Sequence, residues 1–590
     1  MVKRVAIIDK NKCKPNHCGN YWCIGACPVN RTGEECIIKD ENIKKAAIIE
    51  EMCIGCGICL KCPFDAIQIV NLPEELKESP IHRFGINSFR LYGLPLPKKN
   101  TILGILGRNG IGKTTALQIL SKLLKPNLGE YNKEINEEDI IKLYSNNILG
   151  DYLKNLFNNK IKISYKPQRI ELLNNLYRDN IIDLLKKIDE RNLSEKLIEE
   201  LNLEDLKNRK LNELSGGELQ KTAIIACLIK DADIYYFDEP MSFLDITTRM
   251  KVSRIIKKLT LNKSVIIIEH DLTSLDYISD EIQIVYGRET AYGIFSKIKS
   301  TARGINEYLE GYLPEENIRF RDYSIKFSES PIEKEVHKEK LFEFPELKKS
   351  YSNFALDIKG GKVNKGEVIC VVGANGLGKT TFLKLLAGLE KPDNCKLNKI
   401  NISYKPQYLD NNNESTVLEY LQGIAKENFN SGWYKQNVFE KLNLGKLINN
   451  KIRELSGGEL QKVYIAASLS KDCELIAMDE PSAFIDVEDR LKVAEIIKDF
   501  VMKKECSALI VDHDIQFIDY LADSILVFKG TAGKKGEVEG ILNKREGMNL
   551  VLKNLDITYR KDKTSFRPRI NKIGSQLDLQ QRKKGEYYYL

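Results

Sequence analysis

The sequence predicts an α/β protein in which a small cysteine-rich α+β domain precedes two tandem copies of a larger domain. Three observations support this fold class. Five short motifs occur twice in the same order, each copy opens with an apolar segment, a glycine-rich loop and a helical run, and nine of the fourteen cysteines fall in the first 62 residues. Because 590 residues are too many for one hydrophobic core, we expect several domains.

The composition is that of a globular chain, with 42% apolar and 29% charged residues. No segment approaches the roughly 18 to 20 apolar residues of a membrane helix, and the N-terminus has too short an apolar stretch for a secretory signal. We therefore expect a cytoplasmic protein with no membrane partner. Residues 559–590 hold nine Lys or Arg against three Asp or Glu, which fits either a solvated tail or an RNA-facing or domain-clasping segment.

The N-terminal cysteines form two runs, C-x4-C-x4-C-x3-C-P at 13–28 and C-x2-C-x2-C-x2-C-P at 53–63. Cysteines two residues apart wrap one edge of an iron–sulfur cubane, whereas zinc sites more often separate two C-x-x-C hooks by a longer loop. The runs resemble a two-cluster ferredoxin, in which the fourth cysteine of each run ligates the other cluster. We expect two 4Fe-4S clusters, one on Cys27, Cys53, Cys56 and Cys59 and the other on Cys13, Cys18, Cys23 and Cys62.

Internal repeats indicate a duplicated domain. In chain order, the repeated motifs are GRNGIGKTT (107–115) and GANGLGKTT (373–381), SYKPQ (164–168 and 403–407), LSGGELQK (214–221 and 455–462), FDEP (237–240) and MDEP (478–481), and EHD (269–271) and DHD (512–514). The first copy carries about 27 extra residues between 127 and 160. Two amphipathic halves around an Asn-Asn break predict a helix-loop-helix there and favour a partner-binding element over neutral loop drift.

Each copy contains a phosphate-binding loop, because the G-x-x-G-x-G-K-T-T motif stands between an apolar segment and a helical run. The glycines let backbone N–H groups and the helix N-terminus face the phosphates of ATP. The lysine would reach the β- and γ-phosphates, and the first threonine would ligate Mg²⁺. The residues are Gly107, Asn109, Gly110, Gly112, Lys113, Thr114 and Thr115 in the first copy, and Gly373, Asn375, Gly376, Gly378, Lys379, Thr380 and Thr381 in the second.

Further motifs supply the groups that hydrolysis of ATP needs. A buried strand in each copy ends in an aspartate for the magnesium shell and a glutamate that can polarise the attacking water as general base. A glutamine can contact the metal or the water, and a histidine could donate to the γ-phosphate, although a lone histidine is more often structural. In copy order these pairs are Asp238 and Asp479, Glu239 and Glu480, Gln168 and Gln407, and His270 and His513.

The LSGGE sequence is foreign to ordinary P-loop enzymes, and with the other motifs and the D-loops (SFLD 242–245, AFID 483–486) it resembles the signature of ATP-binding-cassette domains. The resemblance implies that ATP binds between two cassettes, so that binding closes a clamp and hydrolysis opens it. The signature and D-loop residues implied to bind ATP are Ser215, Gly216, Gly217, Glu218 and Asp245 in the first copy, and Ser456, Gly457, Gly458, Glu459 and Asp486 in the second.

Over its whole length the chain resembles the ribosome-recycling ATPases, subfamily E of the ATP-binding cassettes or RNase L inhibitor family, in an archaeal-like form. The motifs that carry the resemblance are CIGCGIC (53–59), HRFGINSFRLYGLPLP (82–97), the twin cassettes, the segment 291–321 and FRPRINKIGS (566–575). It implies an ATPase that uses ATP, Mg²⁺ and two 4Fe-4S clusters and splits ribosomes after termination or rescue. The implied partners are ribosomal subunits (the small-subunit protein and RNA), a class-1 release factor or Pelota, and initiation factors.

The resemblance also sets the expected domain boundaries. They are a ferredoxin-like domain at 1–75, cassette one at 76–290, a hinge at 291–335, cassette two at 336–545, and a second hinge with the basic tail at 546–590. Compared with the family, the chain has one residue more between Cys18 and Cys23 and one fewer between Cys59 and Cys62, which makes Cys36 an alternative ligand of the less regular cluster. The insertion reads SNNI (145–148) where the family tends to have a basic residue with Gly-Ser-Glu.

Two points stay open at this stage. The alternative function is an ATP-dependent iron–sulfur redox enzyme or a cluster-assembly ATPase, which would need a further redox centre or a scaffold. The aromatic residues Phe84, Phe89 and Tyr351 precede the P-loops, where they could stack on adenine or pack in the core.

Overall fold

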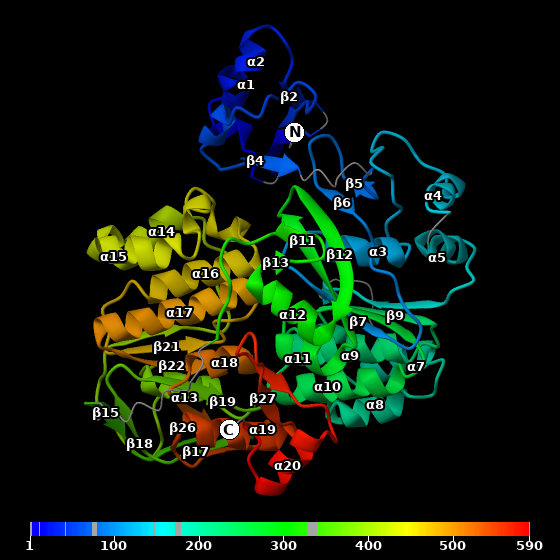
Figure 1. Cartoon of the computed structure of the whole chain (residues 1–590). Coiled ribbons are helices and arrows are strands. Elements are labelled where there is room, and N and C mark those ends of the chain that lie inside the picture. Colours follow the sequence, from blue (N-terminus) through cyan, green and yellow to red (C-terminus); the bar gives the residue numbers. More distant parts are fainter. Residues whose placement is uncertain are drawn as a thin grey trace. The chain divides into compact units, whose positions relative to one another are not determined.

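The computed structural model describes residues 3–10, 12–41, 43–72, 79–145, 148–170, 179–327 and 339–588 (Figure 1). The domain boundary expected at residue 75, the central asparagines of SNNI (146–147) and the end of the first hinge (328–335) lie outside these ranges. The chain forms two compact units. They are Met1–Phe243, Arg254–His270 and Ile278–Tyr323 in the first, and Leu244–Ser253, Asp271–Tyr277 and Ser324–Leu590 in the second.

The N-terminal domain contains two antiparallel strand pairs, β1 (Lys3–Ile8) with β4 (Ile67–Leu72) and β2 (Ile37–Asp40) with β3 (Lys45–Ile48). Two short helices, α1 (Trp22–Ala26) and α2 (Pro28–Arg31), follow one another at the end of the first cysteine run. Its core combines cysteines with a few aliphatic side chains. A core this small stabilises a domain only weakly.

An eight-stranded sheet forms the body of the first cassette. Its strands, in spatial order, are β5 (His82–Arg83), β6 (Arg90–Tyr92), β12 (Tyr292–Ser300), β11 (Glu281–Arg288), β7 (Ile102–Leu106), β10 (Ser264–Ile268), β9 (Ile234–Asp238) and β8 (Ile163–Lys166). The helices that follow its strands are α3 (Lys113–Leu120), α7 (Ile181–Ile188), α8 (Ser194–Glu200), α9 (Gly216–Leu228), α10 (Ile246–Leu259) and α11 (Leu272–Ile278).

The second cassette repeats this plan with a six-stranded sheet and two smaller ones. The six strands, in spatial order, are β20 (Ile402–Lys405), β21 (Leu475–Asp479), β22 (Ser507–Val511), β19 (Val368–Val372), β23 (Ser524–Val527) and β26 (Ile541–Asn543). The smaller sheets are β15 (Lys340–Phe344) with β18 (Gly361–Asn364), and β16 (Leu347–Ser350), β17 (Ala355–Ile358), β25 (Lys535–Val538) and β24 (Lys529–Thr531). The helices are α13 (Lys379–Leu386), α14 (Val417–Ala425), α15 (Gly432–Tyr434), α16 (Gly457–Ser468), α17 (Val487–Lys504) and α18 (Ile515–Leu521).

The two copies share the order of five central parallel strands, β8-β9-β10-β7-β11 in one and β20-β21-β22-β19-β23 in the other. Strands such as SVIII and SALIV are buried at every position. Uninterrupted burial is typical of parallel strands covered by helices on both faces. Their carboxyl ends meet at one edge, where ligands bind in open α/β sheets.

The insertion expected between 127 and 160 contains α4 (Glu137–Leu143) and α5 (Ile148–Phe157). One face of α5 packs on the cassette through Leu149, Tyr152, Leu153 and Leu156, and the Tyr152 hydroxyl lies 2.6 Å from that of Tyr236 in β9. Leu143 and Ile148, which flank the break between the helices, are exposed. The insertion is therefore anchored on one side and presents an apolar tip on the other.

The segment expected as the first hinge begins inside the sheet, because β12 pairs antiparallel with β11 across the boundary at residue 290. It continues into α12 (Thr301–Glu310), β13 (Tyr312–Leu313) and β14 (Ile318–Arg319). The C-terminal residues form α19 (Lys544–Leu555), β27 (Tyr559–Lys561), β28 (Pro568–Ile570) and α20 (Gln576–Lys584).

The basic tail is folded against its neighbours. Arg567 is 0% exposed, and with Arg569 it pairs with Asp276 of α11 within the second unit. A solvated tail is therefore wrong for this segment, which fits the domain-clasping alternative. None of the helices in the described part of the chain combines the length and apolar character that crossing a bilayer requires.

Candidate nucleotide and cluster sites

The P-loop lysines sit at the start of α3 and α13, each with its ammonium group inside the loop. Lys113 Nζ donates to the carbonyl oxygens of Gly107 at 2.8 Å and Arg108 at 2.6 Å. Lys379 Nζ makes the matching bonds to Gly373 and Ala374 at 2.9 and 2.8 Å. These loops present their lysine, their backbone N–H groups and a helix N-terminus to one point, as a phosphate requires.

The expected magnesium ligands meet at the carboxyl ends of β9 and β21. Thr380 Oγ1 donates to Asp479 Oδ2 at 2.5 Å, and Thr114 hydrogen-bonds Asp238 in the first copy. Burial, with the neighbouring Glu239 charge, raises the pKa of Asp238 to about 6, and burial also raises the pKa of Asp479. A hydroxyl and a carboxylate placed together are the oxygen ligands that Mg²⁺ takes in P-loop ATPases.

The predicted hydrolytic side chains converge in both copies. Gln168 Nε2 donates to Glu239 Oε1 at 2.6 Å, and His270 Nε2 lies 3.6 Å from the same oxygen. The second copy has the same arrangement, Gln407 to Glu480 at 2.7 Å and His513 at 3.4 Å. Burial alone would raise the pKa of each glutamate, but the hydrogen bond and charge of the histidine lower it to about 2. Both glutamates are therefore ionised at physiological pH.

Two further pairs of residues bind main-chain carbonyl groups at or beside the predicted catalytic glutamates, and the motif interpretation missed them. Gln220 Nε2 donates to the Glu239 carbonyl oxygen at 2.7 Å, and Gln461 does so to that of Glu480 at 2.5 Å. The second pair is Lys166 and Lys405, at the ends of β8 and β20. All four lie inside the repeated motifs SYKPQ and LSGGELQK, so repetition itself was the signal.

The signature serines cap the helices that follow them. Ser215 and Glu218 form a capping box at the start of α9, and Ser456 and Glu459 form one at the start of α16. The glycines allow close approach of the D-loop, because a Cβ added at Gly217 would lie 2.9 Å from the carbonyl oxygen of Phe243. The N-terminus of each signature helix is thereby ordered, which suits the binding of an anion.

The D-loop aspartates take different partners. Asp245 accepts from Thr248 N at 2.8 Å and from Asn375 N, in the P-loop of the second copy, at 2.9 Å, all within the second unit. Asp486 accepts from Asp489 N at 3.0 Å at the start of α17. An aspartate in the D-loop thus contacts a phosphate-binding loop directly.

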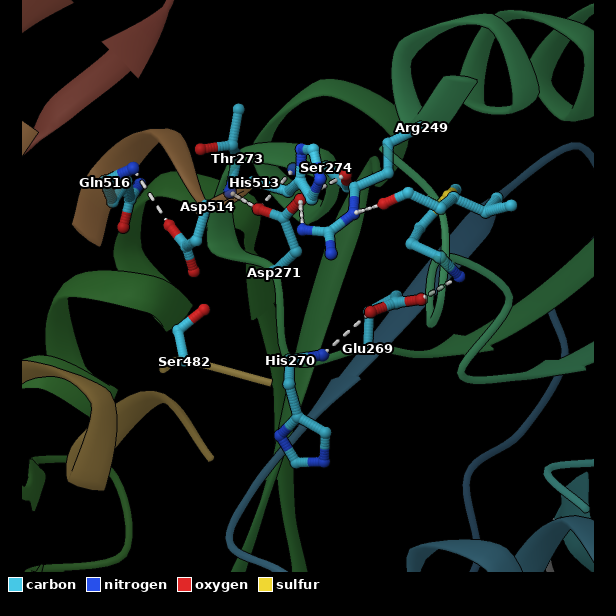
Figure 2. A network of polar contacts seen from close by, with 12 residues as sticks. Arg249, Glu269, His270, Asp271, Thr273, Ser274, Ser482, His513, Asp514 and Gln516 are labelled. Carbon is cyan, nitrogen blue, oxygen red and sulfur yellow. Dashed lines mark hydrogen bonds and ion pairs between the residues drawn. The ribbon is translucent and has the colours of Figure 1, made fainter. Parts of the chain in front are cut away.

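Arginines four residues after these aspartates were also missed. Figure 2 shows Arg249 beside Asp271, with a separation of 3.4 Å between Nη1 and Oδ2. Arg490 pairs with Asp514 at 2.7 Å in the second copy. Asp271 directly follows His270, and Asp514 directly follows His513. Each ion pair therefore joins the helix after the D-loop, α10 or α17, to the loop that carries the predicted catalytic histidine. The signal was the same spacing from the D-loop aspartate in both copies.

The N-terminal cysteines line two cavities. Cys13, Cys18, Cys23 and Cys62 line one of them. The second is lined by Cys27, Cys36, Cys53, Cys56 and Cys59. The other lining residues are mostly apolar. Cysteine-lined cavities with mostly apolar neighbours fit an iron–sulfur cluster, since thiolates are the ligands of such clusters.

The structure places the eight predicted cysteines in the two groups expected from their order. Cys36, the alternative ligand of the less regular set, lines the other cavity. There it hydrogen-bonds Cys27 and Cys53, and burial with these two thiols raises its pKa. Cys36 directly precedes β2, whose first residue, Ile37, lines the same cavity. The spacing of the cysteines in the sequence does not predict this position of Cys36.

The aromatic residues near the P-loops divide into two roles. Phe89 packs against the loop, where a Cβ at Gly112, whose φ is +91°, would lie 2.7 Å from its ring. Phe84 and Tyr351 are 54% and 44% exposed, each beside a second aromatic ring. These two therefore stay the candidates for stacking on adenine.

Within the first unit, the cysteine-rich domain docks on cassette one. Buried Glu50 pairs with Arg83 at 3.0 Å and with Arg90, and the Asn87 side chain bonds Ile8 N and Ala6 O, both at 2.8 Å. On β4, Gln68 Nε2 donates to the Glu289 carbonyl oxygen at 2.9 Å and to Thr290. Thr290 N in turn donates to the carbonyl oxygen of P-loop residue Gly110 at 3.3 Å.

This fold and site define a class of protein, an ATPase with two ATP-binding cassettes and a sulfur-lined N-terminal domain. Family models match the same parts. Residues 97–242 and 357–483 match the family described as ABC transporter, and residues 4–35 match a possible Fer4-like domain in RNase L inhibitor.

Known relatives cover the whole chain. An uncharacterized ABC transporter ATP-binding protein of Methanocaldococcus jannaschii is 47% identical over 592 residues, 100% of this chain and 98% of the relative. The translation initiation factor RLI1 of Saccharomyces cerevisiae is 39% identical over 598 residues, again 100% of this chain and 98% of the relative.

Solved structures agree. A chain in a model of ribosome-bound archaeal Pelota and ABCE1 matches with a TM-score of 0.93 and 47% identity over 100% of both chains. The archaeal ribosome recycling factor aABCE1, in complex with the stalk protein aP1, matches with a TM-score of 0.83 and 45% identity over 87% of this chain and 99% of that one. The chain belongs to the ABCE1, or RNase L inhibitor, family. The predicted family, fold class and ATPase activity are thereby confirmed.

Proposed function

We propose that this chain splits ribosomes into subunits in the cytoplasm, with hydrolysis of ATP as its energy source. The observation that carries the proposal is the full-length match to a chain bound to a ribosome, cysteine-rich domain included. The proposed partners are the ribosomal subunits, through small-subunit protein and RNA, with a class-1 release factor or Pelota, and afterwards initiation factors.

In each cassette the P-loop would bind ATP, with Lys113 or Lys379 at the β- and γ-phosphates. Mg²⁺, when bound, supplies positive charge that stabilises the transferring phosphoryl group. In the first copy Thr114, Asp238 and Gln168 would hold it, and in the second Thr380, Asp479 and Gln407. Glu239 and Glu480, kept ionised by their histidines, would accept a hydrogen bond from the attacking water.

The signature and D-loop residues would complete each site from the opposite cassette. Ser215, Gly216, Gly217 and Glu218 would close on the γ-phosphate held by the second P-loop, and Ser456, Gly457, Gly458 and Glu459 on that held by the first. Asn375 N, in the second P-loop, donates to Asp245 in the D-loop of the first copy. This bond supports the part of the proposal in which residues of the first copy approach the second P-loop. ATP would then favour closure because it makes more contacts in the closed state.

The two cysteine groups would hold two 4Fe-4S clusters. Their place in a domain with a small core favours a structural role, in which the clusters stiffen the domain that docks on cassette one. Glu50, Asn87 and Gln68 would transmit movement of the cassette to this stiff domain.

Co-sedimentation with ribosomal subunits tests the proposal. With a non-hydrolysable ATP analogue, or with Glu239→Gln and Glu480→Gln combined and ATP, the protein should accumulate on small subunits in a sucrose gradient. With ATP, the unmodified chain should be released. Absence from the small-subunit fraction under all conditions would contradict the proposal and favour the redox or cluster-assembly alternative.

A further inference from the structure

A buried lysine lies behind the catalytic carboxylates in each cassette. Lys166 is 1% exposed and Lys405 is 0% exposed. Lys166 Nζ donates to the carbonyl oxygens of Asp238 at 2.9 Å and Glu239 at 3.2 Å. Lys405 Nζ donates to the carbonyl oxygen of Asp479 at 2.8 Å and to that of Pro406 at 3.1 Å.

Burying an ammonium group is costly unless its surroundings compensate the charge. A leucine or methionine would fill these positions at the end of a strand without that cost. The retention of a lysine at both places therefore calls for a reason other than packing.

Each lysine binds the carbonyl oxygen of the aspartate that precedes a glutamate with a strained backbone, and Lys166 also binds the glutamate's own carbonyl oxygen. Glu239 and Glu480 have φ angles of 47° and 48°, in the left-handed region that residues other than glycine seldom adopt. Strain of this kind persists only where surrounding groups hold it, and it clusters at functional sites. Gln220 and Gln461 hold the glutamate carbonyls from one side, and the lysines complete the support.

The lysines also place a fixed positive charge beside two adjacent carboxylates. Through their hydrogen bonds to the main chain, Lys166 lies beside Asp238 and Glu239, and Lys405 lies beside Asp479. Like charges in neighbouring positions would otherwise push each other apart. A positive charge fixed behind the pair allows both carboxylates to face the nucleotide.

We propose that Lys166 and Lys405 are positioning residues, which hold the catalytic glutamates of the two ATP sites in the orientation that hydrolysis needs. The proposal rests on the proposed roles of Glu239 and Glu480. Both copies support it, because in each a buried lysine donates to the carbonyl oxygen of the aspartate before the glutamate. This contact recurs although nearby positions differ, with Met241 and Glu269 in one copy and Ser482 and Asp512 in the other.

The test compares turnover with nucleotide binding in the full-length, iron-loaded protein. Lys166→Met and Lys405→Met together remove both charges and donors at similar volume, and Lys162→Met, at an exposed position just before β8, is the matched control. Steady-state kcat and KM, binding of a fluorescent ATP analogue and the thermal unfolding midpoint are measured for each. We expect kcat to fall roughly 10- to 100-fold, as for other groups that orient metal ligands, with nucleotide affinity unchanged.

A second variant, with glutamine at both positions, is measured in case the methionine variant does not fold. Lys166→Gln with Lys405→Gln keeps a donor without the charge and should show a kcat between those of the unmodified and methionine proteins. Equal kcat in the lysine variants and the Lys162→Met control, or a kcat that falls only in step with ATP binding, would overturn the proposal. If Glu239→Gln with Glu480→Gln retained full turnover, the proposed role of the glutamates would fail first, and this result distinguishes the two failures.

Discussion

The two glutamates proposed as general bases, Glu239 and Glu480, are each held by side chains outside the phosphate-binding loops. Each sits in a strained peptide whose carbonyl accepts a hydrogen bond from a glutamine of the signature helix. Each carboxylate accepts a second bond from the glutamine of SYKPQ. In each copy, the glutamate is therefore hydrogen-bonded both to the SYKPQ motif and to the signature helix.

Replacing Gly458 by alanine tests how closely the signature and D-loop must approach. An added Cβ would lie 2.7 Å from the carbonyl oxygen of Phe484, so the chain would have to shift. We expect a loss of about 1–3 kcal/mol, the usual effect of overpacking, seen as a lower thermal unfolding midpoint for the second cassette. Gly423→Ala in α14 is the control, because nothing lies within 4 Å of its added Cβ. It should gain about 0.5–1 kcal/mol, and equal shifts for both variants would refute the steric argument.

The motifs predicted which of these side chains lie together, because binding of Mg²⁺ and activation of water each need particular side chains close to one another. The threonine and aspartate, and the glutamine and glutamate, lie together as expected. Lys166, Gln220 and Arg249 were missed for one reason. They act on carbonyl groups or on ion partners that the fold brings from elsewhere in the chain, and a motif does not name those partners.

Among the elements, the C-terminal strands and α11 form a buried charged contact within the second unit. Arg567 Nη1 lies 3.5 Å from Asp276 Oδ2, and Arg569 reaches both Asp276 and Asp562 at 3.3 Å. Two guanidinium groups thus depend on Asp276. Breaking a buried pair is costly because it leaves the partner charge uncompensated.

Asp276→Ala should therefore destabilise the packing of the tail by about 3–5 kcal/mol. Hydrogen exchange measured across 559–571 should rise strongly. Glu586→Ala is the control, since its pair with Arg545 spans 3.6 Å between exposed side chains and is worth only about 0–1 kcal/mol. Similar exchange in the two variants would show that the buried contact does not hold the tail.

A second element-scale contact joins the cysteine-rich domain to cassette one through the segment that carries Asn87. This side chain is 0% exposed and satisfies both Ile8 N and Ala6 O. Asn87→Ala should cost about 1–3 kcal/mol, because two buried backbone groups lose their partner. Limited proteolysis should then release the N-terminal domain faster than from Ser88→Ala, whose hydroxyl bonds nearby Ile86. Equal release from both would contradict this role.

Helices with a clear amphipathic repeat could be predicted from the sequence, whereas the boundaries between segments were harder to predict. The two amphipathic halves of the insertion coincide with α4 and α5. The hinge expected from 291 instead starts with a strand, since a short turn lets β12 return along β11. Pairing across a turn is decided by the partner strand, and the sequence of 291–300 alone does not specify it.

For the whole molecule, the first unit links the cysteine-rich domain to an ATP site by a short series of contacts. Gln68 binds the turn at 289–290, Thr290 N donates to Gly110, and Arg108 of the P-loop pairs with Glu289 at 3.1 Å. The N-terminal domain and this phosphate-binding loop are therefore joined through the turn at 289–290. The family resemblance predicted the parts, whereas these contacts needed the folded chain.

Removing iron by chelation should affect this arrangement selectively. The N-terminal domain has a small core, so loss of its clusters should raise hydrogen exchange across 13–62 while both cassettes still bind a fluorescent ATP analogue. The cassettes have large cores of their own. Unchanged exchange across 13–62 after iron removal would contradict the structural role proposed for the clusters.

A splitting assay tests most directly whether the chain separates ribosomes into subunits with ATP. Intact ribosomes carrying Pelota or a release factor are mixed with the iron-loaded chain and Mg-ATP, and the fraction separated into subunits is followed by light scattering. We predict splitting by the unmodified chain with ATP, repeated turnover only where ATP is hydrolysed, and no splitting without nucleotide. Intact ribosomes after incubation with an ATPase-active, iron-loaded chain and its partner factor would contradict it.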